Sequence, residues 1–428
     1  MHDGKGEDQE PNTAGVDRLS ELPDNVIHYI LSLVSTVDVV RMSILSKRWQ
    51  RMWYSLPVLC FSDSADFGKS KSTKLCKFVG KCFTLRKNDL LNVTDTTITK
   101  VMLSTTYSWS RTCSWLRLVA KSNIKELDLD LPWLRKHRFP LELLCSKSLT
   151  HLRLSCVSFP NLHSASLPSL ISLSLESLLL DDHAFHNLLL GCCSLEKLLI
   201  KYCHHLSNPK VSNSSLKFLE IGSSYAYDFG EMFRVDAINL ESFICHGSRI
   251  CCMSTLASCG KLRNLTFSQS RIKDQWLEDL IFRLPVLESL TLEYCNELRN
   301  IKICRSPSFK ISMNVRSLVE ANVTLSPVGH WKDNFLPVVY DTSWYTNLLY
   351  FLSNLDCSKN MDLRVYSEEA LIFPDELRRA HDAPLPTVKH LKVTTCRSLM
   401  RNTDLQDSLF WALPTLETMR LDLRNRQF

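Results

Sequence analysis

The chain has 428 residues, of which 45% are hydrophobic and 22% are charged, and its formal net charge is +6. This length allows two or three ordinary domains or one long repeat array, and the hydrophobic content supports a packed interior. Only 11 glycines are present, and no GxGxxG or GxxxxGK[ST] phosphate loop occurs. The modest charge does not indicate nucleic-acid binding.

The N-terminal residues 1–17 are polar and acidic, and we expect them to be disordered. They lack the apolar core of a signal peptide, and no run of 18 apolar residues predicts a membrane span. The 17 cysteines are therefore expected in a reducing compartment, where disulfides are rare. We expect the protein in the cytoplasm, the nucleus or both.

Three short helices are predicted between residues 18 and 60. The first starts around Pro23, where the missing proline N–H costs nothing, and Ser46 caps the third. Trp49 and Trp53 lie four residues apart and share one face of that third helix. Helical spacing of apolar residues marks the first two helices, through Val26, Ile27, Ile30 and Leu31 and then Val37, Val40 and Ile44. A unit this small has little core of its own.

The segment Leu22 to Pro57 resembles the F-box motif of plant proteins. The matching positions occur in order and comprise Leu22-Pro23, Ile30-Leu31, Asp38-Val39-Val40-Arg41, Ser46-Lys47-Arg48-Trp49 and Trp53. Val34-Ser35-Thr36 stands where many relatives have a proline before the second helix. The alternative interpretation is a small helical bundle that caps the rest of the fold.

This resemblance implies that the segment docks on a Skp-type adaptor, which tethers it to a cullin and a RING protein. By motif position, the expected adaptor-binding residues are Leu22, Pro23, Ile27, Ile30, Leu31, Val40 and Trp49. The motif does not separate residues that contact the adaptor from residues that hold the helices together.

The remainder of the chain repeats an apolar-x-x-apolar-x-apolar pattern. It starts at Ile98, Ile124, Leu149, Leu170, Leu195, Leu216, Leu240, Leu262 and Leu287. Subtraction gives intervals of 26, 25, 21, 25, 21, 24, 22 and 25 residues, all within the period of a leucine-rich repeat. Alternate apolar residues of each short strand, such as Leu152 and Leu154, are expected to point inward, and neighbouring turns bury them jointly in a parallel sheet.

The segments between these strands differ in length. Helical returns are predicted in two longer intervals, through Ala184, Phe185, Leu188 and Leu189 and through Trp276, Leu277, Leu280, Ile281 and Leu284. The 21- and 22-residue intervals are expected to return in extended form. This irregular array resembles the degenerate leucine-rich repeats of plant F-box proteins.

The pattern weakens at about residues 296–387 and returns at Val388 and Leu416, with a helix predicted through Leu405, Leu409, Phe410 and Leu413. The predicted fold is α/β. An N-terminal three-helix F-box (residues 18–60) precedes a curved leucine-rich-repeat solenoid (residues 70–428), with a parallel sheet on its concave face.

Cysteines follow three of the strands. Cys203, Cys295 and Cys396 each come three residues after the last apolar strand position, where repeats use Asn or Cys to satisfy backbone groups. We expect them to be buried and reduced. A metal site at Cys192, Cys193, Cys203, His204 and His205 is disfavoured because no C-x2-C pair is present. We expect no metal and no cofactor.

No local arrangement of residues indicates catalysis. Asp181-Asp182-His183 is interpreted as a helix cap, and the nucleophile-elbow string G-x-S-x-G is absent. Basic residues from Lys69 to Lys87 alternate with apolar ones at helical spacing, which favours an amphipathic helix over a nucleic-acid site.

Residues between the apolar strand positions should face the concave surface, which solenoids use for protein ligands. There we expect Lys201, Phe218 and Ile244 to contribute to target binding, with loops around Trp331 to Trp344 as the alternative. The resulting hypothesis is a non-enzymatic adaptor of an SCF-type ubiquitin ligase that binds an unidentified target protein. The alternative is a repeat scaffold that does not lead to degradation.

Overall fold

The structure is a computed structural model of the chain. It describes residues 21–62, 77, 79–82, 84, 98–104, 109–120, 123–131, 137–159, 162–222, 233–247, 256, 258–295, 297–305, 308–315, 318–325, 340–355, 358–397 and 402–423. The expected disorder of residues 1–17 lies outside the described residues. Within them, no helix is both long enough and apolar enough to cross a membrane.

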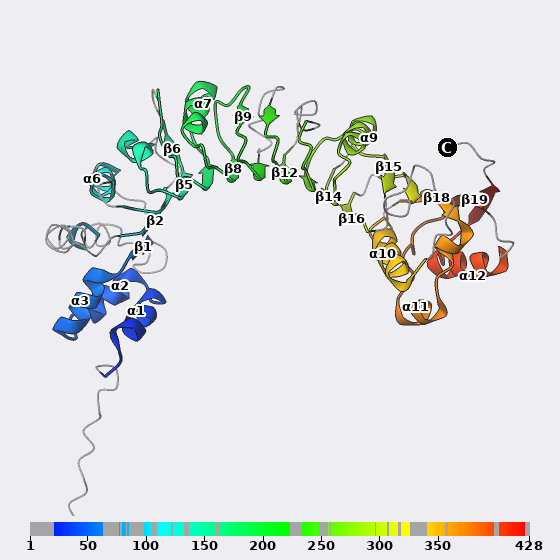
Figure 1. Ribbon diagram of the computed structural model, residues 1–428, viewed down its shortest axis with the longest axis horizontal. Coiled ribbons are helices and arrows are strands. Elements are labelled where there is room, and N and C mark those ends of the chain that lie inside the picture. The colour runs from blue at the N-terminus through cyan, green and yellow to red at the C-terminus, as the bar shows by residue number, and fades with distance from the viewer. Residues whose placement is uncertain are drawn as a thin grey trace, which may run out of the picture. The chain divides into compact units, whose positions relative to one another are not determined.

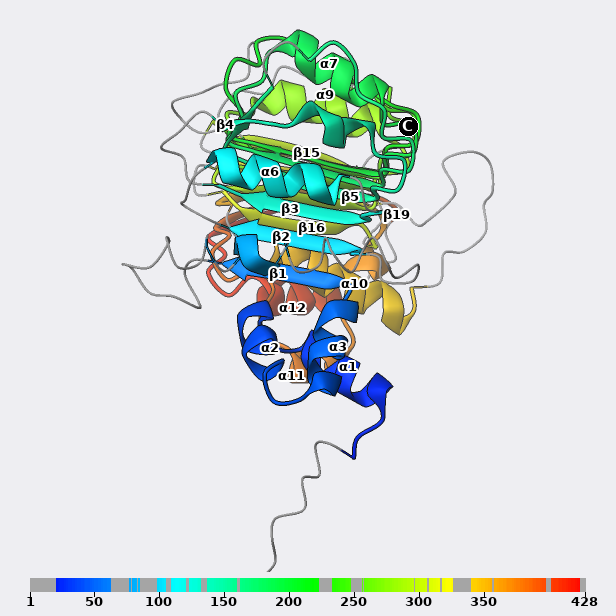
Figure 2. The same cartoon turned by 90° about the vertical axis from the view of Figure 1, so that its left-hand side faces the viewer.

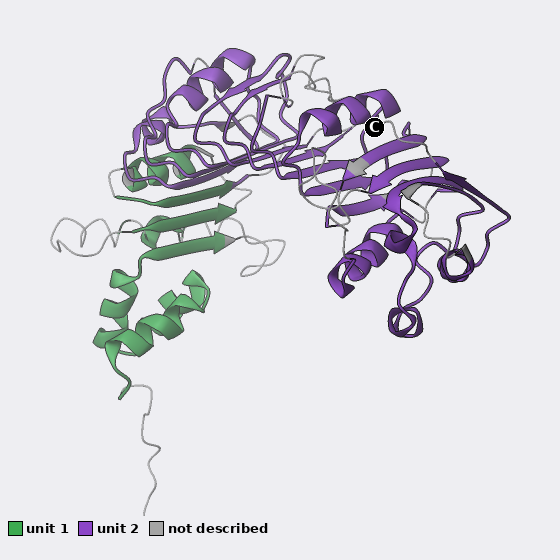
Figure 3. Cartoon of the chain, turned by 45° about the vertical axis from the view of Figure 1, so that its right-hand side comes forward, with its two compact units in different colours: residues 1–129 green, residues 130–428 purple. Residues whose placement is uncertain are grey.

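The chain forms two compact units, residues 1–129 and 130–428 (Figure 3). The first unit opens with three helices, α1 (Asp24–Ser32), α2 (Thr36–Met42) and α3 (Lys47–Ser55). The first and third begin where the sequence predicts, and α2 begins at Thr36, one residue before the first apolar residue of its predicted pattern. Pro23 occupies the N-cap position of α1, and the Ser46 side chain caps α3 by accepting a hydrogen bond from Trp49 N at 3.2 Å.

Strands follow the helices in the first unit. They are β1 (Val58–Ser62), β2 (Lys100–Ser104) and β3 (Glu126–Asp130), in that order in one sheet, with α6 (Trp109–Val119) between the last two. The predicted basic amphipathic helix lies partly outside the described residues. Of those described, residues 77, 79–82 and 84 are helical, with Val79 and Cys82 buried and Lys77 and Lys81 exposed.

The second unit is a parallel solenoid. Its main sheet has the strand order β5 (His151–Ser155), β7 (Ser172–Glu176), β8 (Lys197–Lys201), β10 (Phe218–Gly222), β12 (Ser242–His246), β13 (Asn264–Ser268), β14 (Ser289–Glu293) and β16 (Lys310–Asn314). These strands line the inner side of the unit's curve, while α7 (Asp182–Leu190) and α9 (Asp274–Arg283) lie on the outer side (Figures 1 and 2). The predicted parallel sheet on the concave face is confirmed.

All nine predicted repeat starts lead into strands. In each turn the strand begins two residues after the first apolar position, so that Leu149 precedes β5 and Leu195 precedes β8. The two later apolar positions are buried in every case, as shown by Leu198 and Ile200, both 0% exposed. Because each strand pairs in register with its neighbours, the same positions form continuous buried rows across the sheet.

The connections also follow the predicted division. The two predicted helical returns are α7 and α9, and after the repeat strands the described residues of the 21-residue intervals contain only the short strands β6 (Val157–Ser158) and β9 (Lys210–Ser212). Further short outer elements are β4 (His137–Arg138), η1 (Leu141–Cys145) and β11 (Arg234–Asp236). In the 22-residue interval from Leu240 to Leu262, residues 248–255 and 257 lie outside the described residues.

The irregular region from about residue 296 starts a second sheet. Its order is β15 (Asn300–Arg305), β17 (Glu320–Leu325), β18 (Asn360–Ser367), β19 (His390–Arg397) and β20 (Thr418–Leu423). The helical elements around it are α10 (Thr342–Ser353), η2 (Glu368–Leu371), α11 (Asp375–Ala380) and α12 (Asn402–Ala412), and α12 is the predicted return. The pattern weakens because β14 pairs with β16 while the intervening β15 pairs with β17.

Candidate functional site

The N-terminal helices divide their apolar side chains between interior and surface. Ile27 of α1 is 0% exposed, Leu31 is 1% exposed, and Trp49 of α3 is 3% exposed. Trp53 lies one turn beyond Trp49 and is also buried, as the spacing predicts. These buried side chains hold the three helices together, so three of the seven expected adaptor-binding residues have a structural position.

The other four expected residues are accessible. Pro23 is exposed, and Leu22, Ile30 and Val40 are partly exposed. Leu22 and Pro23 precede α1, Ile30 lies on α1, and Val40 lies on α2. Their availability to a partner is consistent with docking, and their role stays a prediction.

Further large apolar side chains on this unit are exposed and were not singled out from the sequence. On α1, Val26 is 36% exposed and Tyr29 is 66% exposed, and Leu33, the C-cap residue that follows the helix, is 71% exposed. Together with Ile30 they follow i, i+3, i+4, i+7 spacing, which places them on one side of the helix. We call Leu22, Pro23, Val26, Tyr29, Ile30 and Leu33 the α1 apolar face. The signal in the sequence is that α1 has more apolar residues than one buried stripe requires.

A second exposed apolar pair follows α2. Ile44 is 86% exposed and Leu45 is 64% exposed, and both lie in the turn before the Ser46 cap. The apolar spacing predicts Ile44 within the second helix, but α2 ends at Met42. The α-helical pattern ends there because the next two amides bond only three residues back, Ile44 N to the Arg41 carbonyl and Leu45 N to the Met42 carbonyl.

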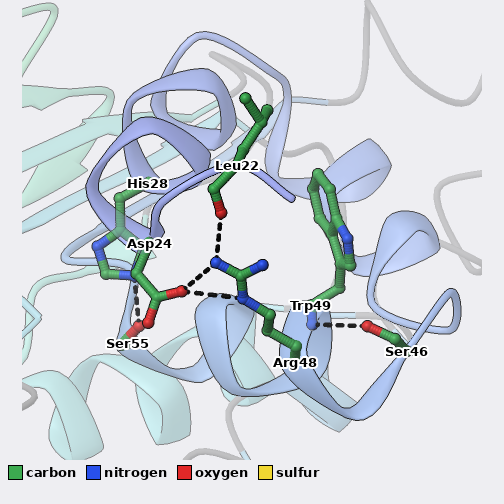
Figure 4. Close-up of polar contacts among 7 residues, drawn as sticks. All are labelled: Leu22, Asp24, His28, Ser46, Arg48, Trp49 and Ser55. Atoms are coloured by element: carbon green, nitrogen blue, oxygen red, sulfur yellow. Dashed lines mark hydrogen bonds and ion pairs between the residues drawn. The ribbon is translucent and has the colours of Figure 1, made fainter. Parts of the chain in front are cut away.

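Polar contacts fix the segment that precedes α1 (Figure 4). Arg48 of α3 donates from Nε to Asp24 Oδ1 at 2.9 Å and from Nη2 to the same oxygen at 2.5 Å. The same Nη2 also donates to the Leu22 carbonyl oxygen. A second link joins the helices, since His28 Nε2 and Ser55 Oγ are 2.8 Å apart. Both contacts connect residues of α1 or its lead-in to α3.

The three residues expected to bind a target lie on adjacent strands of the second unit. Lys201 is on β8, Phe218 on β10 and Ile244 on β12. All three are partly exposed rather than fully exposed, and Lys197 Nζ lies 4.9 Å from the Phe218 ring centroid. Phe218 and Ile244 therefore offer less apolar surface than their positions in the sequence suggested.

Glu220 is central to this part of the concave face. Its side chain is 13% exposed, and its Oε1 lies 2.5 Å from Lys201 Nζ and 3.5 Å from His246 Nε2. His246 Nδ1 in turn contacts the Ser268 hydroxyl. Lys201 is thus one half of an ion pair, which the sequence of a single strand cannot show because the partner sits on the next strand.

Two of the cysteines behave as predicted. Cys203 and Cys295 are 5% and 0% exposed, and each thiol donates to two backbone carbonyls at 3.6 to 3.8 Å. Burial raises the pKa of Cys203 to about 12 and that of Cys295 to about 11. Cys396 lies within its strand, β19, whereas Cys203 and Cys295 follow theirs. The Cys396 side chain lies outside the described part. No group of three or more potential metal ligands occurs among the described residues.

The predicted cap at the start of α7 is confirmed. Asp181 Oδ1 accepts a hydrogen bond from Ala184 N at 2.7 Å. Asp182 has a different role, because its carboxylate accepts bonds from Ser207 N and Asn208 N in the following turn. Asp274 of α9 repeats this link by accepting from Arg299 N at 2.8 Å. Aspartates at the start of helical returns thus connect one turn to the next.

Comparison with known protein families agrees with the geometry. The F-box domain family matches residues 19–61, and the family of leucine-rich repeats described for FBD-associated F-box protein At5g56370 matches residues 113–259. The first match covers α1 to α3 and nearly all of β1, and the second covers strands from β3 to β12.

Three relatives come from Arabidopsis thaliana. F-box/LRR-repeat protein At1g48400 is 30% identical over 54% of this chain and 48% of its own length, and FBD-associated F-box protein At4g13985 is 32% identical over 44% and 43%. The chain thus spans less than half of either protein. F-box/LRR-repeat protein 25 is 31% identical over 49% of this chain, and the match covers 72% of that relative. With both family matches, this coverage shows that the chain belongs to the F-box/LRR-repeat proteins.

Proposed function

We propose that the chain is the target-binding adaptor of an SCF-type ubiquitin ligase and that its F-box binds a Skp-type adaptor. F-box domains typically bind such adaptors. The observation that carries the proposal is the α1 apolar face, together with Ile44 and Leu45, on a unit of three short helices. Exposed apolar clusters of this kind mark partner surfaces, and full burial of one such side chain contributes about 1.5–3 kcal/mol. The chain itself performs no chemistry in this proposal.

The test is a pull-down with a purified plant Skp-type adaptor. Leu22→Ala combined with Pro23→Ala should abolish capture because the variant removes the opening residues of the motif while leaving the buried Ile27, Leu31 and Trp49 in place. Pro57→Ala, at an exposed proline after α3, is the matched control and should bind normally. Unchanged capture of a correctly folded double variant would refute the assignment.

For the second unit we propose target binding on the concave face around Lys201, Phe218 and Ile244. These residues occupy neighbouring strands, and large apolar side chains dominate the energy of many interfaces. A partner can first be captured with an F-box-deleted chain. Substitution of each of these three residues by alanine should then lower the affinity of the chain for that partner. Undiminished affinity would indicate that the target binds to loops instead, including the segment from Trp331 to Trp344. Residues 331–339 of that segment lie outside the described part.

The alternative function is a repeat scaffold that binds its partner without leading to degradation. The two functions differ in what happens to that partner. Deletion of the F-box should raise the partner's half-life in cells if the chain directs ubiquitin transfer. An unchanged half-life with retained binding would favour the scaffold.

A further inference from the structure

The lead-in to α1 has few internal constraints of its own. Leu22 and Pro23 lie before the helix, and the Pro23 N-cap makes no side-chain capping hydrogen bond. Proline fixes its own φ and restricts the preceding residue to extended backbone, but it does not attach the Leu22 backbone to another helix. The position of the Leu22 side chain therefore depends on what holds its backbone.

Arg48 supplies that contact from α3. Its guanidinium reaches the carbonyl of Leu22 and the carboxylate of Asp24 (Figure 4), which are the residues before and after Pro23 in the sequence. A guanidinium can do this because its N–H donors form a rigid planar fork, whereas a lysine ammonium is a single rotating donor group. The contact thus attaches the residues on both sides of Pro23 to α3.

The first turn of α3, which carries Arg48, is held in place by its own contacts. The neighbouring Trp49 is buried, and the Ser46 cap fixes the first turn of α3. The Arg48 side chain is 30% exposed, whereas that of Asp24 is 64% exposed. An isolated pair with this exposure contributes little to stability, typically about 1 kcal/mol or less. The geometry is therefore better suited to orienting Leu22 and Pro23 than to stabilising the fold.

We propose that Arg48 is a positioning residue that holds Leu22 and Pro23 in the orientation required for adaptor docking. This inference rests on the proposed function of the F-box. Arg48 acts through the lead-in segment and not through a contact of its own with the adaptor. Its effect on affinity should therefore require an intact Leu22 side chain.

The experiment is a double-mutant cycle on the full chain, with adaptor affinity measured by calorimetry and thermal stability measured in parallel. Arg48→Lys should weaken adaptor binding about tenfold in the otherwise unchanged chain, but only about twofold in the Leu22→Ala chain. Its effect on thermal stability should be equal in both backgrounds because Leu22→Ala keeps the backbone carbonyl. Arg51→Lys, at an exposed position of the same helix, is the control and should leave affinity unchanged.

Equal losses of affinity in both backgrounds would overturn the inference, since they would mean that Arg48 contacts the adaptor directly or supports the fold in general. Unchanged affinity for Arg48→Lys in a chain that binds the adaptor would also overturn it while leaving the proposed function intact. A wild-type chain that does not bind the adaptor would overturn both.

Discussion

The F-box unit leaves several large apolar side chains exposed, whereas the repeat strands bury theirs. In the F-box unit, Ile44 just after α2 is 86% exposed and Leu33 just after α1 is 71% exposed, whereas in the strands the repeated positions such as Leu198 and Leu219 are 0% exposed. Each strand has a similar strand on either side to share the burial, but three short helices cannot enclose all of their apolar residues. Apolar content alone therefore does not locate the core, and the excess in the helices is the basis of the proposed docking surface.

The largest effect on stability is expected in the buried rows. Leu198→Ala should lower the free energy of unfolding of the second unit by about 2–5 kcal/mol, because it leaves a cavity between β7 and β10. Leu33→Ala should change the free energy of unfolding by less than about 0.5 kcal/mol. Chemical denaturation of both variants measures the difference. Similar losses would show that Leu33 belongs to a core.

A smaller effect is expected at the helical returns that connect the rows. Asp181→Ala should destabilise the second unit by about 1 kcal/mol, because it removes the hydrogen bond to Ala184 N that caps α7. Asp407→Ala, at an exposed position inside α12, is the matched control and should have almost no effect. Thermal denaturation of the two variants tests this, and equal melting temperatures would argue against the cap.

The smallest effect concerns reactivity and not stability. Burial raises the pKa of Cys203 to about 12, so at pH 8 almost all of this thiol is in the unreactive protonated form. Iodoacetamide should therefore label the exposed Cys145 and Cys193 in the native protein, and label Cys203 and Cys295 only after denaturation. Because the pKa is raised, reactivity of Cys203 should appear only as pH approaches that value. Mass spectrometry after labelling of the native protein at pH 8 is the measurement, and labelling of Cys203 or Cys295 would contradict the prediction.

The regular part of the fold could be predicted because its signal is repeated. A single strand pattern such as that at Leu195 means little, but the stacked turns require the same spacing many times. The prediction weakened at residues 296–387 because β15 and β17 form one pair and β14 and β16 another, which brings strand starts too close together for one repeat period. Local spacing does not reveal which sheet a strand joins.

The candidate sites could be predicted less completely. The F-box motif identified the correct helices, but it included the buried Ile27 and Trp49 and omitted the exposed Tyr29 and Leu33, because a motif records both packing and contact residues. On the concave face, the alternation of side chains predicts that Lys201 is accessible, and the structure shows it partly exposed. Its ion pair with Glu220 depends on the register between β8 and β10, which the sequence of either strand does not contain.

The most direct test of the F-box proposal is the affinity of the Leu33→Glu variant for a purified Skp-type adaptor, measured by calorimetry. Leu33 lies at the end of the α1 apolar face and contributes little to the core, so the variant should keep its melting temperature. Its adaptor affinity should fall at least about tenfold, which corresponds to about 1.4 kcal/mol. Unchanged affinity in the folded variant would contradict the assignment of docking to this face.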